Sequence, residues 1–144
     1  MPTRKASAEW QGGLKDGKGT FTAESGSVGG EYSFGSRFGP GGASNPEELL
    51  AAAEAACYSM ALSGALEKAG TPATSVHTDA ACTIEKVGDG FKITTMKLKV
   101  RARVPGADRD TFKDTAEATK SSCPVSMALL GNVDIELDAV LEED

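Results

Sequence analysis

The chain has 144 residues, the size of one ordinary domain with a core large enough to fold without disulfide bonds. Its 15 lysine and arginine residues against 21 aspartate and glutamate residues give a formal net charge of −6, which provides no broad positive surface for nucleic acid or anionic lipid. Three cysteines without a CxxC pair exclude a secreted disulfide framework. We therefore expect a single domain over residues 1–144 that works in the cytoplasm, with no nucleic-acid and no membrane partner.

The N-terminal segment is glycine-rich and predicts short strands. Small apolar and aromatic residues alternate around positions 6–10, 19–22 and 32–34. The pair Asp16-Gly17 predicts a hairpin between the first two strands, because it supplies the positive backbone angles of a tight turn. The stretch GSRFGPGGASNP that follows has the composition of a loop.

A long central helix is predicted from the motif NPEE at residues 45–48, in which Asn45 caps, Pro46 takes the first helical position and acids fill the first turn. From residue 49 to 66 the only charge is Glu54, so we expect protein on nearly every face. A membrane span is disfavoured, because the run is mostly alanine with serines, a glycine and a charge. Its small residues instead suit close approach by another helix, and the same helix of a second copy is an attractive candidate.

The rest of the chain predicts two more helices and three alternating strands. Apolar residues alternate over residues 76–84 and 96–104 on either side of a Gly-Asp-Gly turn, which predicts a long hairpin with a bulge near Thr94-Thr95. A polar helix, a short helix and a final strand are expected at residues 108–122, 124–130 and 133–141. This order favours an α+β domain over a regular βαβ arrangement.

The three cysteines lie in unlike settings. Cys57 sits in the alanine-rich helix, where a thiol is usually a small inert apolar residue. Cys123 precedes Pro124 at a predicted helix start, where free backbone amides stabilise a sulfur anion. Cys82 is in phase with the apolar face of its strand and is expected in the core. If folding brings Cys57 and Cys123 together, they form a redox pair.

The single histidine, His77, is poorly placed to assist a thiol. It falls on the strand face opposite Cys82 and is expected to be exposed. A Cys–His catalytic arrangement and a zinc site built from His77 and the three cysteines are therefore both disfavoured. A reactive thiol here needs another cation, and Arg37 in the glycine-rich loop is the best candidate. Glu47 is the candidate to orient its guanidinium through a bidentate ion pair.

The sequence resembles the OsmC/Ohr family of thiol-dependent hydroperoxide reductases, in particular its OsmC branch. The resemblance rests on KDGKGTFTAESG near the start, GSRFGPGGASNPEELLAAAEAACYSMAL in the middle, then VPGADRDTF and SSCPVSMAL. It implies an OsmC/Ohr-like fold in which antiparallel sheets wrap long central helices in an intertwined homodimer. Glu47 and Cys57 are ten positions apart, about 15 Å along a helix, which is too far for one subunit's Glu47 to serve its own Cys57, and a second subunit could supply it.

By position, the resemblance makes Cys57 the peroxidatic cysteine and Cys123 the resolving cysteine, with Arg37 and Glu47 as the activating pair from the other subunit. The free amides at a helix start would by themselves make Cys123 the more acidic thiol, which conflicts with a first attack on peroxide by Cys57. Glu54 is outside the family pattern, and an acid within a turn of Cys57 disfavours its thiolate if it points the same way.

The implied reaction reduces organic hydroperoxides, and hydrogen peroxide more weakly, through a Cys57 sulfenic acid and a Cys57–Cys123 disulfide. No metal, flavin or other cofactor is implied. The partners are a small hydroperoxide, an external dithiol such as the dihydrolipoyl group of a lipoylated protein, and a second copy of the chain. The alternatives are a thiol redox sensor or disulfide carrier that uses the same pair, and an interaction module whose cysteines are structural.

Overall fold

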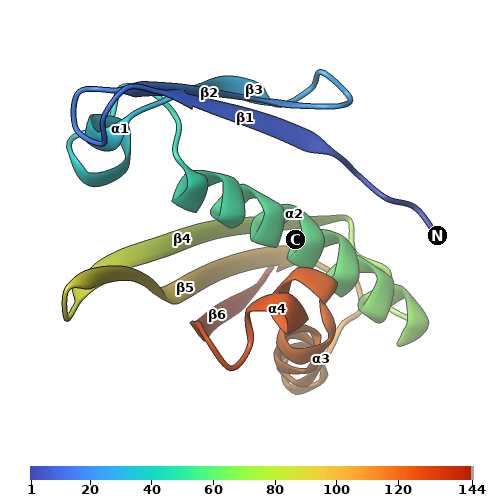
Figure 1. Ribbon diagram of the computed structural model, residues 1–144. Helices are drawn as coiled ribbons and strands as arrows, with labels where there is room; N and C mark the ends of the chain where they lie inside the picture. Colours follow the sequence, from blue (N-terminus) through green and yellow to red (C-terminus); the bar gives the residue numbers. More distant parts are fainter. Residues whose placement is uncertain (144) are drawn as a thin grey trace. The chain divides into compact units, whose positions relative to one another are not determined.

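The computed structural model describes residues 1–143 and divides into two compact units, residues 1–49 and residue 50 onward. A single domain over residues 1–144 remains a prediction. The predicted succession of strands, helix, strands, helices and strand is confirmed, with one additional short helix (Figure 1). In chain order the elements are β1 (Ala6–Gln11), β2 (Lys18–Ala23), β3 (Gly29–Tyr32), α1 (Phe34–Phe38), α2 (Pro46–Lys68), β4 (Ser75–Val87), β5 (Gly90–Arg103), α3 (Arg109–Ser122), α4 (Pro124–Leu129) and β6 (Asp134–Glu142).

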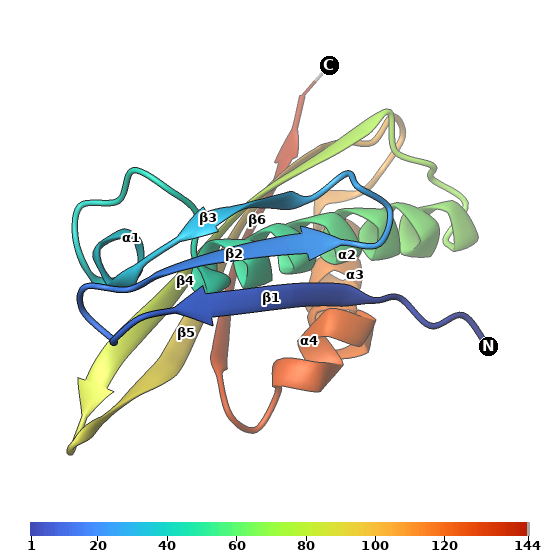
Figure 2. The ribbon, with the colours of Figure 1, turned by 45° about the horizontal axis from the view of Figure 1, so that its top comes forward.

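The first unit contains the antiparallel sheet β1-β2-β3, which Figure 2 shows as three adjacent ribbons. The predicted hairpin between β1 and β2 is confirmed, but its positive backbone angle is at Gly12 (φ 95°) and not at Gly17. Gly17 is needed for another reason, since a Cβ there would collide with the carbonyl oxygen of Gly13. The loop is thus longer and more tightly folded than a two-residue turn.

A short helix, α1, replaces the predicted end of a strand at Phe34 and the first part of the predicted loop. Its start is fixed by a capping box between two serines. The Ser33 hydroxyl accepts a hydrogen bond from the Ser36 amide (3.1 Å), and the Ser36 hydroxyl accepts one from the Ser33 amide (2.8 Å). This pairing satisfies backbone donors that an extended chain would leave to solvent, and it overrides the glycine-rich composition.

Helix α2 begins and ends where the sequence predicts. The Asn45 side chain accepts a hydrogen bond from the Glu48 amide (2.8 Å). At the other end Gly70 adopts φ 91°, and the Thr71 amide donates to the Leu66 carbonyl (3.0 Å), as in a Schellman motif. By length and composition alone α2 could cross a membrane, but the core helix of a globular protein meets the same criteria.

One face of α2 is exposed, so the prediction that protein surrounds this helix is wrong for the single chain. Only 22% of its most apolar stretch is buried. The exposed positions recur at helical spacing and are mostly small: Ala52, Ala53, Ala56, Met60 and Ser63. Such a surface lets another helix approach closely.

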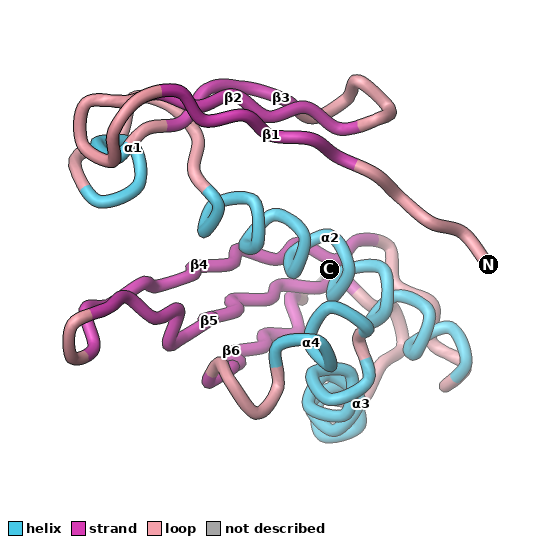
Figure 3. Tube along the Cα trace, in the orientation of Figure 1, coloured by secondary structure: helices cyan, strands magenta, loops and turns pink. Residues whose placement is uncertain are grey.

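The second unit contains the sheet β4-β5-β6. Strands β4 and β5 form the predicted long antiparallel hairpin, and the predicted bulge is confirmed: Thr83 pairs with Thr95 and Ile84 with Ile93, which leaves Thr94 as the extra residue. The prediction of antiparallel sheets is wrong for one strand pair, because β6 pairs with β5 in parallel. The intervening helices α3 and α4 carry the chain back across the unit, the kind of crossover that a parallel pair requires (Figure 3).

The core of the second unit fixes α2 and α3 against one face of this sheet. Its buried apolar side chains come from β5 (Met96, Leu98, Val100 and Ala102), α2 (Tyr58, Leu62 and Leu66) and α3 (Phe112 and Ala116). Full burial of a large apolar side chain stabilises a fold by about 1.5–3 kcal/mol. The Tyr58 hydroxyl also donates a hydrogen bond to the Ala116 carbonyl (2.8 Å), which fixes the position of α3 relative to α2.

Candidate active site

Cys57 and Cys123, 66 positions apart in sequence, lie side by side in the second unit. Cys57 is in the middle of α2 and half-buried, whereas Cys123 is at the junction of α3 and α4 and fully buried. The Cys123 sulfur is a hydrogen-bond donor to the Cys57 sulfur at 2.9 Å. Both residues are unoxidised thiols, and their separation requires little movement to reach the roughly 2.05 Å of a disulfide bond.

The helix-end amide that sequence reasoning assigned to Cys123 serves Cys57 instead. Cys123 is the N-cap of α4, and its side chain makes no capping hydrogen bond. The backbone amide of Val125, in the first turn of α4, donates a hydrogen bond to the Cys57 sulfur and lowers its pKa. The amide at the start of this helix therefore stabilises an anion on the mid-helix sulfur of Cys57.

Nevertheless, the surroundings within the second unit raise the pKa of Cys57 overall. Burial is the largest cause, followed by the contact with the Cys123 sulfur; the negative charge of Glu54 adds to the same direction. A thiol with a raised pKa is mainly protonated at neutral pH and is a poor nucleophile. A reactive Cys57 at neutral pH would require a cation beyond these groups.

Glu54 is a buried acid next to the two thiols. It lies one turn before Cys57 on α2 and is fully buried. Its Oε1 accepts a hydrogen bond from the Ser126 hydroxyl and lies 4.0 Å from the Cys123 sulfur, whereas its Oε2 has no hydrogen-bond partner within residues 1–143. From the sequence, Glu54 was expected only to disfavour the Cys57 thiolate, and Ser126 was not predicted to take part. Its position three residues after Cys123, one helical turn along the chain, is the signal that could have indicated it.

Arg37 and Glu47 form an ion pair within the first unit. The Arg37 Nε and one of its terminal nitrogens both lie 2.9 Å from Glu47 Oε1. Both nitrogens contact the same oxygen, so the bidentate pair predicted from the sequence, with one nitrogen on each oxygen, is not formed. The buried Oε2 of Glu47 has no hydrogen-bond partner among the described residues. Because the second terminal nitrogen of Arg37 takes no part in this ion pair, the guanidinium can bind Glu47 and a ligand at the same time.

The geometry of the loop explains how Arg37 is held. The Asn45 side-chain amide donates to the Ser36 carbonyl (3.0 Å), and the Ser36 hydroxyl donates to the Ser44 carbonyl (2.7 Å). These bonds tie α1 to the start of α2, where Glu47 occupies the first turn. The Arg37 guanidinium also stacks 5.3 Å from the centre of the Phe38 ring.

The two other residues considered from sequence lie apart from this chemistry. His77 is exposed on β4 and hydrogen-bonds to Asp79 (3.0 Å), as predicted for the outer strand face. Cys82 is half-buried against the core of the second unit, in line with its apolar phase. The residues described by the structure contain no cluster of three or more histidine, cysteine or acidic side chains arranged to hold a metal ion.

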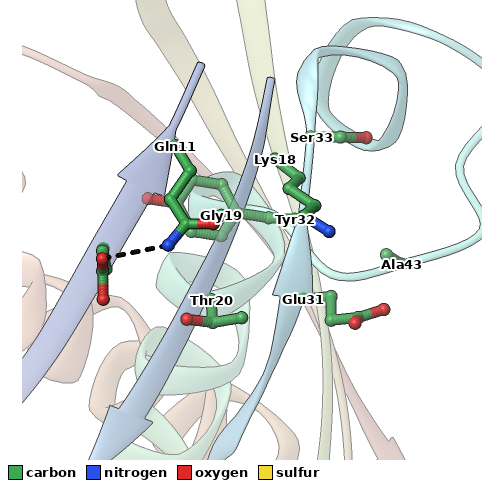
Figure 4. A pocket seen from close by; sticks show the side chains of 9 residues that line it. Gln11, Lys18, Gly19, Thr20, Glu31, Tyr32, Ser33 and Ala43 are labelled. Atoms are coloured by element: carbon green, nitrogen blue, oxygen red, sulfur yellow. Dashed lines mark hydrogen bonds between the residues drawn. The ribbon is translucent and has the colours of Figure 1, made fainter. Parts of the chain in front are cut away.

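Two cavities of the first unit differ in character. One, of about 300 Å³, is mainly lined by polar side chains of the β1-β2-β3 sheet and includes Lys18, Glu31 and Tyr32 (Figure 4). It contains neither a thiol nor Arg37. A second, of about 190 Å³, is lined by aromatic and apolar side chains and includes Arg37: Trp10, Leu14, Tyr32, Ser33, Phe34, Arg37 and Phe38.

The α+β fold and the adjacent thiols of the second unit define a small protein with a two-cysteine centre suited to redox chemistry. Residues 39–138 match the family model of the OsmC-like proteins, and the chain therefore belongs to the OsmC family. It is 43% identical to peroxiredoxin OsmC of Escherichia coli (strain K12) over 92% of this chain and 94% of that protein.

Two further relatives extend the comparison to the Ohr branch. The chain is 33% identical to the organic hydroperoxide resistance protein of Xanthomonas axonopodis pv. citri over 67% of each chain. The crystal structure of an organic hydroperoxide resistance protein from Elizabethkingia anophelis superimposes with a TM-score of 0.76 and 26% identity, over 99% of this chain and 98% of that one. The predicted OsmC/Ohr-like fold is confirmed.

Proposed function

We propose that this protein is a cytoplasmic, thiol-dependent peroxidase that reduces organic hydroperoxides, and hydrogen peroxide more weakly, to an alcohol and water. The observation that carries the proposal is the 2.9 Å contact between the sulfurs of Cys57 and Cys123, two residues remote in sequence. The names of the relatives support the same activity, since one is a peroxiredoxin and another an organic hydroperoxide resistance protein.

In the first step the Cys57 thiolate attacks one oxygen of the substrate's O–O bond. That bond breaks, the alkoxide leaves with its electron pair and takes up a proton, and Cys57 becomes a sulfenic acid. The Val125 amide stabilises the attacking sulfur anion. A guanidinium beside the reacting atoms would stabilise both the thiolate and the charge that grows on the departing oxygen.

In the second step the Cys123 sulfur attacks the Cys57 sulfenic acid, which forms a disulfide and releases water. Rapid capture protects Cys57 from a second peroxide molecule and from irreversible oxidation. An external dithiol then reduces the disulfide by thiol–disulfide exchange. We propose a dihydrolipoyl group on a lipoylated protein as this dithiol.

We assign the activating cation to Arg37 of a second copy of the chain, held by Glu47 of that same copy. The two residues form an ion pair with each other within one chain. Glu47 and Cys57 are ten residues apart on α2, about 15 Å along the helix axis, which is too far for one chain's Glu47 to serve its own Cys57. The exposed small-residue face of α2 suits the close approach of a second copy.

The apolar cavity beside Arg37 supports an organic substrate. Its aromatic lining, which includes Trp10, Phe34 and Phe38, offers a surface for an alkyl or aryl group next to the guanidinium. Hydrogen peroxide has no apolar part and would gain nothing from such a lining. We therefore expect a larger kcat/KM for cumene hydroperoxide than for hydrogen peroxide.

Multiple turnover separates a peroxidase from a redox sensor that uses the same cysteines. With excess cumene hydroperoxide and dihydrolipoamide, the protein is expected to consume many equivalents of peroxide at a steady rate. A sensor or disulfide carrier oxidises once and is re-reduced slowly. Consumption that stops after one equivalent per Cys57, with the dithiol still present, would favour the sensor, and two unreactive thiols would favour a structural role for the cysteines.

Complementation between two inactive variants tests whether the sites are shared. Glu47→Ala and Cys57→Ser proteins are each expected to be inactive alone, and mixed dimers made by co-refolding should regain up to about one functional site per dimer. Co-refolding of each variant with itself is the control. If the mixed sample stays as inactive as the controls while native mass spectrometry shows mixed dimers, the arginine pair does not act across subunits.

A further inference from the structure

Glu54 is an ionisable side chain with no assigned role in the reaction, and its position is costly. It is 0% exposed, and among the residues described here no lysine or arginine forms an ion pair with it. One carboxylate oxygen, Oε2, has no hydrogen-bond partner in the part of the chain that the structure describes. A buried carboxylate without a cation destabilises a fold, and it also raises the pKa of Cys57.

The hydrogen bonds of the Glu54 carboxylate orient it toward the thiol of Cys123, the proposed resolving cysteine. Its Oε1 is held by the Ser126 hydroxyl, from the short helix that Cys123 caps. The same oxygen is the acceptor for the Cys123 thiol at 4.0 Å. Cys123 thus lies between two acceptors, Glu54 Oε1 on one side and the Cys57 sulfur on the other.

We propose that Glu54 is the general base of the resolving step, which takes the proton of the Cys123 thiol as Cys123 attacks oxidised Cys57. Cys123 is fully buried and has no direct access to solvent hydroxide. A thiol must lose its proton to become a nucleophile, so a buried resolving thiol needs an internal acceptor. Glu54 is the carboxylate within reach, and Ser126 is a positioning residue that orients it.

The step balances without any further reactant. The Cys123 S–H proton passes to Glu54 Oε1, and the Cys123 sulfur donates an electron pair to the sulfur of the Cys57 sulfenic acid. The S–O bond breaks and its electron pair leaves with the hydroxide. Glu54 returns the proton to this hydroxide, so water and the disulfide are the products and the carboxylate is restored.

This role explains why an acid that hinders the first step is present. The negative charge of Glu54 disfavours the Cys57 thiolate, and therefore slows attack on peroxide. Once Cys57 is oxidised, the same carboxylate accepts the Cys123 proton and is neutralised by it, so the Cys123 thiolate forms without a second negative charge beside it. Glu54 thus slows the attack of Cys57 on peroxide but speeds disulfide formation, and rapid disulfide formation limits over-oxidation of Cys57.

The test is rapid chemical quenching of Glu54→Gln. Reduced protein is mixed with one equivalent of cumene hydroperoxide, and mass spectrometry follows the Cys57 sulfenic acid, trapped with dimedone, and the Cys57–Cys123 disulfide. We expect sulfenic acid to form at least as fast as in the wild type and the disulfide to form about 100-fold more slowly at pH 7. Glu67→Gln, which removes an exposed charge from the same helix, is the matched control and should behave as the wild type.

The pH profile separates a base from a structural residue. In Glu54→Gln this carboxylate no longer accepts the proton, and disulfide formation depends on the small fraction of Cys123 that is already a thiolate. The rate should then rise about tenfold per pH unit between pH 6.5 and 8, below the ordinary thiol pKa of about 8.5. The wild-type rate should be nearly flat over that interval. A uniform loss of rate without this slope, or an unchanged rate in the variant, overturns the proposal.

Two remaining outcomes are also decisive. If Glu54→Gln does not fold, judged by circular dichroism, the wild-type profile alone decides, since a tenfold rise per pH unit in the wild type rules out an internal base. The proposal rests on the proposed function, but the two fail differently. If wild-type Cys57 never forms a sulfenic acid the peroxidase assignment fails, whereas normal sulfenic acid with unaltered resolution in Glu54→Gln refutes only the role of Glu54.

Discussion

Replacement of Cys57 by serine is expected to abolish hydroperoxide reduction, with a loss of at least about 10³-fold in kcat/KM measured with cumene hydroperoxide and a dithiol. A serine hydroxyl is almost fully protonated at neutral pH and is a far weaker nucleophile toward an O–O bond than a thiolate. The substitution is nearly isosteric at a half-buried position, so the fold should persist.

Cys123→Ser is the informative partner of that variant. It keeps the attacking sulfur and removes only the sulfur that lies 2.9 Å away. The first peroxide equivalent should therefore still be reduced, while Cys57 accumulates as sulfenic acid and is then over-oxidised under excess peroxide. Cys82→Ser is the control, because Cys82 is not expected to react. If Cys123→Ser loses the first equivalent and Cys57→Ser keeps it, the order of attack is the reverse of the one proposed.

Replacement of Arg37 by methionine is expected to lower kcat/KM at pH 7 by about 10²-fold or more, because one preorganised donor to a developing oxyanion is typically worth that factor. Methionine preserves most of the length of the side chain and can still pack on Phe38. It removes the charge that, in the proposed dimer, opposes the raised pKa of Cys57.

The pH dependence should change in a defined direction. Burial and the contact with Cys123 raise the pKa of Cys57, and a guanidinium beside the sulfur lowers it again. Without that cation the thiolate fraction at pH 7 is small and grows about tenfold per pH unit, so activity in Arg37→Met should climb steeply toward pH 9 while the wild type is flatter. Arg4→Met, at an exposed position of the same unit, is the control. Equal pH profiles for Arg37→Met and the wild type would exclude Arg37 as the activating cation.

Much of the fold could be predicted because its elements follow local rules. Asn45 and Pro46 mark the start of α2, and strict alternation assigns the buried face of β5, including the bulge at Thr94. What failed depends on contacts that alternation does not encode. The capping box of α1 lies in a stretch with loop composition, and the parallel pairing of β6 depends on the path of α3 and α4.

The residues of the site could be predicted from the sequence, but the hydrogen bonds between them could not. The sequence nominated two thiols and an arginine–glutamate pair, and the structure brings together the members of each pair. The sequence did not indicate that the Val125 amide, at the start of α4, donates a hydrogen bond to Cys57. Nor did it indicate that Glu54 is hydrogen-bonded to Ser126 next to Cys123. Both features arise from the way α2 packs beside the α3–α4 junction, which no local motif specifies.

The central claim is that Cys57 and Cys123 act as one redox pair, and peptide mass spectrometry after a single equivalent of an alkyl hydroperoxide tests it most directly. Without added reductant, the account predicts a disulfide that joins the Cys57 and Cys123 peptides in nearly every chain and leaves Cys82 as a thiol. Recovery of Cys57 and Cys123 as separate peptides, whether unreacted or individually over-oxidised, would contradict it.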